Sequence, residues 1–107
     1  MGGNNNKLHD AIVARTRKRL EAVGCMTIHL ESFTRRKIGR RFIPIKLSIP
    51  PGWPDIISFT PGGRVEFYEV KTGDAKLSKD QKIRFAELAR RGHLIRIIHE
   101  NKTEVFK

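Results

Sequence analysis

Residues 55–71 read DIISFTPGGRVEFYEVK, in which two β-rich runs flank a turn of proline and glycine. The proline at position 61 cannot adopt a positive φ, which disfavours a two-residue type I′ loop between the runs. We therefore expect a three-residue loop, 61–63, with Gly63 in the left-handed conformation. Such a loop pairs Thr60 with Arg64 and makes the segment an antiparallel hairpin.

Counting outward from this loop gives the register of the hairpin. Ile57 then lies opposite Phe67. In the same way Asp55 lies opposite Glu69, with the two Cβ atoms about 5 Å apart on one face of the sheet. Carboxylates at that separation repel each other unless one is protonated or a cation lies between them. Because hard oxygen ligands with no Cys or His nearby favour Mg²⁺ or Mn²⁺ over zinc, the hairpin predicts a site for one of these ions.

Lys71 is expected on the same face of the strand as Glu69, because it lies two residues farther on and side chains alternate. There its ammonium could orient an attacking water or neutralise charge developing on the phosphate. The metal would activate the water and the scissile phosphate. The plainer alternative is that Asp55 is a turn residue and that Glu69 and Lys71 are exposed charges paired with each other. A register shift of one residue would move Asp55 to the other face and remove the site.

The composition suits one basic domain. The chain has 107 residues, and 22 Lys and Arg against 11 Asp and Glu give a formal charge of +11. Such an excess favours a polyanionic partner, nucleic acid before a membrane surface, because neutralising phosphates releases condensed counterions. No apolar run approaches the roughly 20 residues that span a bilayer, and the start of the chain is unlike a secretory signal. We therefore expect a soluble, cytoplasmic protein.

Helical and strand patterns alternate along the rest of the chain. Residues 1–6 read as a flexible tail, and residues 7–23 have the spacing of an amphipathic helix that Gly24 ends. Its expected apolar stripe repeats at i+4 through Leu8, Ile12, Thr16 and Leu20. A second helix should begin at Ser78 and end at Gly92. Strands are expected at residues 26–30, 94–99 and 103–106. This order predicts an α/β fold, a mixed β-sheet flanked by helices, with residues 7–107 as one domain.

Residues 32–54 contain many basic residues and no acidic one until Asp55. A turn at Gly39 predicts a basic hairpin or flap beside the core. We expect phosphate contacts from this segment and from the first helix. The candidate residues are Arg35, Arg36, Lys37, Arg40, Arg41 and Lys46, with Arg15 and Arg19. The alternative is a solvated basic surface without a partner.

Three short motifs together resemble one known family. They are Gly52-Trp53-Pro54-Asp55, Glu69-Val70-Lys71 and Leu77-Ser78-Lys79-Asp80-Gln81. This combination resembles the VRR-NUC (virus-type replication-repair nuclease) branch of the PD-(D/E)xK superfamily. The resemblance implies a restriction-endonuclease-like core in which Asp55, Glu69 and the Val70 carbonyl bind Mg²⁺ or Mn²⁺. It also implies that Lys71 is the catalytic lysine.

Two positions leave alternatives open. Gln81 matches the glutamine that the family carries on the helix after the core strands, near the metal-bound water or phosphate. Residues 78–81 also form a capping box, in which Gln81 would only close the helix start. The family's first-helix glutamate is missing, and His9 stands at its position beside Asp10. Either His9 substitutes for it or Asp10 reaches into the site, unless Asp10 is a helix N-cap.

The resemblance implies a Mg²⁺-dependent endonuclease that hydrolyses DNA phosphodiester bonds and prefers DNA to RNA. Similarity to the small phage and bacterial members of the family further implies a homodimer that acts on branched DNA such as four-way (Holliday) junctions, as in DNA repair. One alternative is a non-catalytic basic nucleic-acid-binding domain derived from a nuclease, which the missing glutamate favours. Another is a sequence-specific restriction or homing-type endonuclease, for whose recognition elements 107 residues leave little room. Trp53 either stacks on a base or packs beside the proline-rich turn.

Overall fold

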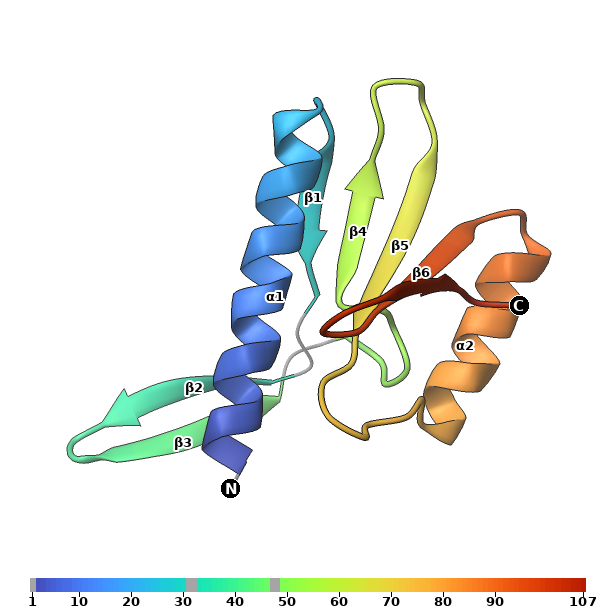
Figure 1. Cartoon of the computed structure of the whole chain (residues 1–107). Helices are drawn as coiled ribbons and strands as arrows, with labels where there is room; N and C mark the ends of the chain where they lie inside the picture. Colours follow the sequence, from blue (N-terminus) through green and yellow to red (C-terminus); the bar gives the residue numbers. More distant parts are fainter. Residues whose placement is uncertain (1, 31–32, 47–48) are drawn as a thin grey trace.

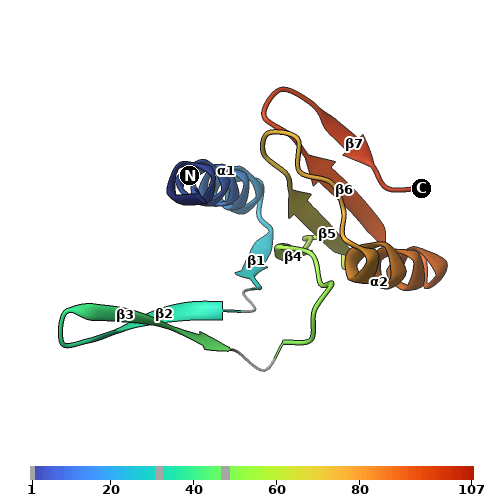
Figure 2. The same cartoon turned by 90° about the horizontal axis from the view of Figure 1, so that it is seen from below.

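A five-stranded mixed sheet with one helix on each face forms the body of the protein (Figures 1 and 2). The computed structural model describes residues 2–30, 33–46 and 49–107, with the side chains of residues 7–30, 39–41 and 49–107. The sheet has the order β1-β4-β5-β6-β7, and only the β5–β6 pair is parallel. The elements are α1 (Gly2–Ala22), β1 (Met26–His29), β2 (Phe33–Ile38), β3 (Arg41–Lys46), β4 (Ile56–Phe59), β5 (Val65–Val70), α2 (Lys79–Arg90), β6 (Leu94–Ile98) and β7 (Thr103–Val105). The predicted α/β class is confirmed.

The β4–β5 hairpin has the loop and the register that the sequence predicts. Thr60 N–H donates to the Arg64 carbonyl at 2.9 Å, and Gly63, with φ of 85°, donates to the Thr60 carbonyl at 3.0 Å. Ile57 pairs with Phe67, and the last pair of the ladder joins Ile56 to Tyr68. The next residues outward from the loop are Asp55, directly before β4, and Glu69, near the end of β5. The hairpin therefore brings the two acidic residues to the same end of the sheet.

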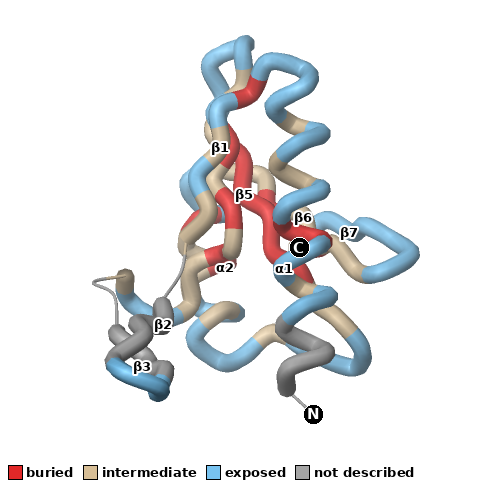
Figure 3. Tube along the Cα trace, turned by 90° about the vertical axis from the view of Figure 1, so that its left-hand side faces the viewer, coloured by how far each residue is buried: buried red, intermediate tan, exposed pale blue. Residues whose placement is uncertain are grey.

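Two apolar clusters hold the helices against opposite faces of the sheet. Alternation along β4 and β5 sends one set of side chains to each helix. The cluster under α1 contains Ile12, Val13, Ile56, Tyr68 and Val70. The cluster under α2 contains Phe67, Phe85, Leu88 and Ile95. Burial is concentrated along β5, as Figure 3 shows. Full burial of one large apolar side chain stabilises the fold by roughly 1.5–3 kcal/mol.

Helix α1 differs from the expectation in its start and in its buried side. It begins at Gly2, so residues 2–6, which were expected as a tail, belong to the helix. Once packed residues nucleate a helix, each added residue gains a hydrogen bond. No proline or cap sets a later start for α1, so the helix extends back to Gly2. Leu8, expected in the apolar stripe, is 40% exposed, whereas Val13 is buried. The buried side of α1 therefore runs through His9, Ile12 and Val13.

Helix α2 begins and ends as the sequence predicts. Ser78 is its N-cap, the capping box is complete, and Gly92 adopts φ of 88° directly beyond its C-cap. Because α2 connects the parallel strands β5 and β6, its first turn lies close to the end of β5, where Glu69 and Lys71 are found. Within the described ranges, no helix is long and apolar enough to cross a membrane.

The basic segment forms a hairpin of its own. Strands β2 and β3 pair antiparallel as a separate two-stranded sheet, which projects away from the body of the protein (Figures 1 and 2). Arg40 and Arg41 are exposed at its turn, beside Gly39 with φ of 63°. The side chains of Arg35, Arg36, Lys37 and Lys46 lie outside the part of the chain that the structure describes. The predicted hairpin is therefore present, and its phosphate contacts stay a prediction.

Candidate active site

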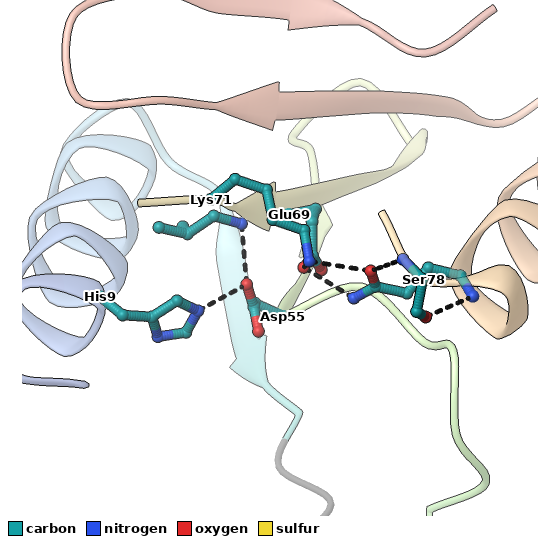
Figure 4. A network of polar contacts seen from close by, with 7 residues as sticks. His9, Asp55, Glu69, Lys71 and Ser78 are labelled. Atoms are coloured by element: carbon teal, nitrogen blue, oxygen red, sulfur yellow. Dashed lines mark hydrogen bonds and ion pairs between the residues drawn. The ribbon is translucent and has the colours of Figure 1, made fainter. Parts of the chain in front are cut away.

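Asp55 is held at the start of β4 by contacts from three other segments. Its backbone carbonyl accepts a hydrogen bond from Leu30 N–H at 2.6 Å. Its carboxylate oxygen Oδ2 accepts one from Val70 N–H at 2.8 Å and lies 3.1 Å from His9 Nε2. Figure 4 shows His9 and Asp55 pointing toward each other from α1 and the start of β4. The side chain is thus fixed against the end of β5, beside Glu69.

Glu69 is an almost fully buried carboxylate, with 2% of its surface exposed. Oε2 accepts a hydrogen bond from Gln81 Nε2 at 2.9 Å and lies 3.2 Å from Lys71 Nζ. Oε1 is buried and has no hydrogen-bond partner within the described part of the chain. Burial, and then the charge of Asp55, raise the pKa of Glu69 to about 7, although Lys71 and Gln81 act in the opposite direction.

Lys71 and Gln81 form the side of the site next to α2. Lys71 Nζ donates to Gln81 Oε1 at 2.8 Å, and Ser78 N–H donates to the same oxygen at 2.9 Å. Gln81 N–H in turn donates to Ser78 Oγ at 3.1 Å. The two interpretations of Gln81 are therefore compatible, because one side chain closes the capping box and contacts both Glu69 and Lys71.

His9 occupies the place where the resemblance predicts a glutamate. Its Nδ1 lies 3.5 Å from Asp10 Oδ1, while its Nε2 faces Asp55. The hydrogen bond with Asp55 raises the pKa of His9, and burial opposes this shift. Asp10 is exposed and contacts His9. An N-cap role for Asp10 is wrong, because α1 has already begun at Gly2.

The donor set fits a hard divalent cation better than it fits a buried ion pair. Oε1 of Glu69 is a desolvated carboxylate oxygen without a partner in the described residues, next to a second carboxylate. A buried polar atom of this kind is costly unless a cation or water satisfies it. No group of three His, Cys, Asp or Glu side chains suited to a metal is found among the described residues. A metal here would therefore need backbone, water or phosphate oxygens besides Asp55 and Glu69.

Four of the predicted DNA-binding residues, Arg15, Arg19, Arg40 and Arg41, have described side chains, and these four lie outside this contact network. Arg15 and Arg19 are exposed on α1. They follow His9 along the helix axis by about 9 and 15 Å, because each helical residue rises 1.5 Å. Arg17, between them, donates to Thr27 Oγ1 at 3.0 Å. The structure thus joins Asp55, Glu69, Lys71, Gln81 and His9 in one network, to which none of these four described basic side chains belongs.

Sequence reasoning missed one contact of the site. The Val70 N–H fixes the Asp55 carboxylate, and only the expected register could have indicated it. Of the two alternatives for Trp53, the structure shows packing, because the centroid of its ring lies 6.2 Å from that of Phe67 and the Arg84 guanidinium lies over it.

The sequence profile of the VRR-NUC domain family matches residues 5–100 of the chain. A solved structure described as a VRR-NUC domain is similar in fold, with a TM-score of 0.59 and 21% sequence identity. The similarity covers 85% of this chain and 82% of that one. No curated protein matches the chain.

Proposed function

Because this chain belongs to the VRR-NUC family of nuclease domains, we propose that it is a metal-dependent endonuclease that hydrolyses DNA phosphodiester bonds. The observation that carries this proposal is the buried Oε1 of Glu69, without a partner in the described residues and beside Asp55 and Lys71. A carboxylate pair next to a lysine suits metal-assisted phosphodiester hydrolysis, since it combines a cation site with a positive charge for the phosphate.

We assign the metal site to Asp55, Glu69 and the backbone carbonyl of Val70, with Mg²⁺ or Mn²⁺ as the ion. When bound, such an ion supplies charge neutralisation and activation of a water. Mg²⁺ usually keeps several waters and takes only one or two carboxylates from the protein, which agrees with this small donor set. His9 contacts Asp55 Oδ2 and would orient that carboxylate, as partners of metal ligands commonly do.

Lys71 and Gln81 would act on the phosphate side of the site. Lys71 Nζ is held by Gln81 at 2.8 Å and by Glu69 at 3.2 Å, so its charge is already positioned. A preorganised cation stabilises charge developing on phosphate oxygens without reorganisation during the reaction. Gln81 sets the position of the ammonium and can itself contact a water or phosphate oxygen.

The DNA substrate is proposed from charge and from the family. A formal charge of +11 favours a polyanion, and Arg15, Arg19, Arg40 and Arg41 are exposed for backbone contacts. Such contacts position a duplex but carry no base information. Selectivity for branched DNA, with a homodimer spanning the junction, is part of the proposal and rests on the resemblance.

The test is cleavage of supercoiled, linear, single-stranded and four-way-junction DNA with Mg²⁺, Mn²⁺ or EDTA. We expect metal-dependent cleavage by the wild type, its loss in Asp55→Ala and Lys71→Ala, and faster cleavage of the junction. Asp74→Ala and Lys76→Ala, exposed residues of the loop before α2, are the matched controls and should retain activity. Cleavage that continues in EDTA, or in both site variants, would refute the proposal.

A second candidate is a non-catalytic nucleic-acid-binding domain. The observation that favours it is His9, which brings a nitrogen and not a carboxylate to Asp55. Salt-sensitive DNA binding without cleavage under either metal would make this function the better one. A sequence-specific restriction or homing-type enzyme would instead cut at defined sites on linear DNA.

A further inference from the structure

The loop before Asp55 lies directly against the first turn of α2. Gly52 has φ of 94°, and a Cβ atom at this position would be 2.6 Å from the carbonyl oxygen of Asp80. It would also lie 2.8 Å from the Asp80 carbonyl carbon. Backbone atoms of a helix cannot move aside as the end of a flexible side chain can. Only glycine therefore permits both this conformation and this close approach.

Trp53 extends the contact by one more turn of the helix. The guanidinium of Arg84 lies 5.2 Å from the centroid of the Trp53 ring, within the range of a cation–π interaction. Arg84 Nε is buried and makes no hydrogen bond within the described residues, and the guanidinium to which it belongs lies over the Trp53 ring. Trp53 also packs on the α2 cluster through Phe67. The loop thus holds α2 at Asp80 and at Arg84.

Gln81 lies between these two points of attachment. Its amide contacts Glu69 and Lys71. At the other end of the loop, Trp53 is joined to Asp55 by the buried Pro54. A short segment with both ends fixed therefore connects the carboxylate of Asp55 to the helical turn that carries Gln81.

We propose that Gly52 and Trp53 are positioning residues that fix Asp55 relative to the Gln81 turn of α2. The consequence is a set distance between the two halves of the site, the one made by β4 and α1 and the one made by β5 and α2. This inference rests on the proposed function, because the position of Asp55 matters for a metal site. Loss of a group that orients a metal ligand typically weakens metal binding by about 10- to 100-fold.

A purely structural role would reduce stability and leave metal affinity unchanged. Gly92 provides the control that separates the two roles. It has φ of 88° at the other end of α2, and a Cβ atom there would meet nothing within 4 Å. Gly92→Ala therefore introduces similar backbone strain without a clash and away from the site.

The experiment compares Gly52→Ala and Gly92→Ala in three measurements. Mn²⁺ affinity by calorimetry should weaken about 10- to 100-fold in Gly52→Ala and by less than about 2-fold in Gly92→Ala. Amide hydrogen exchange of Gln81 and Lys82 without metal should accelerate in Gly52→Ala alone. Urea unfolding gives the loss of stability in each variant. Equal Mn²⁺ affinities, or unchanged exchange at Gln81 and Lys82 in Gly52→Ala, would overturn the inference.

Two further arms keep the result unambiguous. If Gly52→Ala does not fold, Arg84→Met removes the cation over Trp53 and keeps an unbranched apolar stem; it should also weaken Mn²⁺ binding, and an unchanged affinity counts against the inference. If the wild type neither binds Mn²⁺ nor cleaves DNA, the proposed function fails. The exchange measurement then still decides whether the loop holds the start of α2.

Discussion

Replacing Glu69 by glutamine should change the pH dependence of stability in a defined direction. The folded protein raises the pKa of Glu69 from 4.5 to about 7, first through burial and then through Asp55. An acid with a raised pKa in the folded state stabilises that state when protonated, and this stability is lost as pH rises from 4.5 through about 7. At about 1.4 kcal/mol for each pKa unit, the wild type loses roughly 3 kcal/mol over this window.

Glu69→Gln is neutral throughout that window and escapes this loss. Its amide leaves one buried polar group without a partner, which costs about 1–3 kcal/mol at every pH. The free energy of unfolding of the variant minus that of the wild type should therefore rise by roughly 3 kcal/mol between pH 4.5 and pH 8. The assay is urea unfolding in EDTA at half-unit pH steps.

A control of opposite sign is available at the surface. A hydrogen bond from His99 lowers the pKa of Glu104, so the same difference for Glu104→Gln should fall as pH rises. A difference for Glu69→Gln that is flat with pH, or that falls, would refute the claim that Glu69 is a desolvated carboxylate beside a second negative charge. Excess Mn²⁺ should stabilise the wild type at pH 8 and leave the variant unchanged.

Three other variants test separate features of the protein. Phe85→Ala should lower the free energy of unfolding in urea by about 3–5 kcal/mol, because the ring is fully buried between α2 and the sheet. A loss below about 1 kcal/mol would contradict that packing. His9→Glu adds a third carboxylate next to Asp55, so thermal unfolding should show lower stability in EDTA and a larger Mg²⁺-induced gain than in the wild type. Arg40→Ala combined with Arg41→Ala should weaken DNA binding uniformly across sequences and reduce the slope of log K against log salt by about 2, as fluorescence anisotropy can measure. An unchanged slope would remove the hairpin turn from the DNA-binding surface.

The hairpin register could be predicted from the sequence because two residues determine it. Proline at position 61 excludes the commonest two-residue loop, and Gly63 supplies the positive φ of a three-residue one. Every later pair then follows by counting, including the juxtaposition of Asp55 and Glu69. The Ser78 capping box was equally local, since the signal and the structure involve the same four residues.

Features that depend on tertiary packing were not predicted in the same way. The choice between His9 and Asp10 depends on how α1 is rotated on the sheet, which the burial of Ile12 and Val13 decides. His9 shares their side of the helix, because it precedes Ile12 by three residues and Val13 by four. The i+4 repeat that begins at Leu8 indicates a neighbouring stripe, and the sequence alone does not decide between the two. The start of α1 was missed because no cap or proline marks it. The contact of Gly52 with α2 joins segments far apart in the chain, and no local pattern encodes it.

Calorimetric titration of Mn²⁺ into the wild type, Asp55→Asn and Glu69→Gln measures the carboxylate site without any DNA. We expect the wild type to bind Mn²⁺ and both variants to lose this binding, while the exposed control Asp74→Asn binds as the wild type does. Wild-type affinity retained in Asp55→Asn and Glu69→Gln would contradict the assignment of the metal site to these residues.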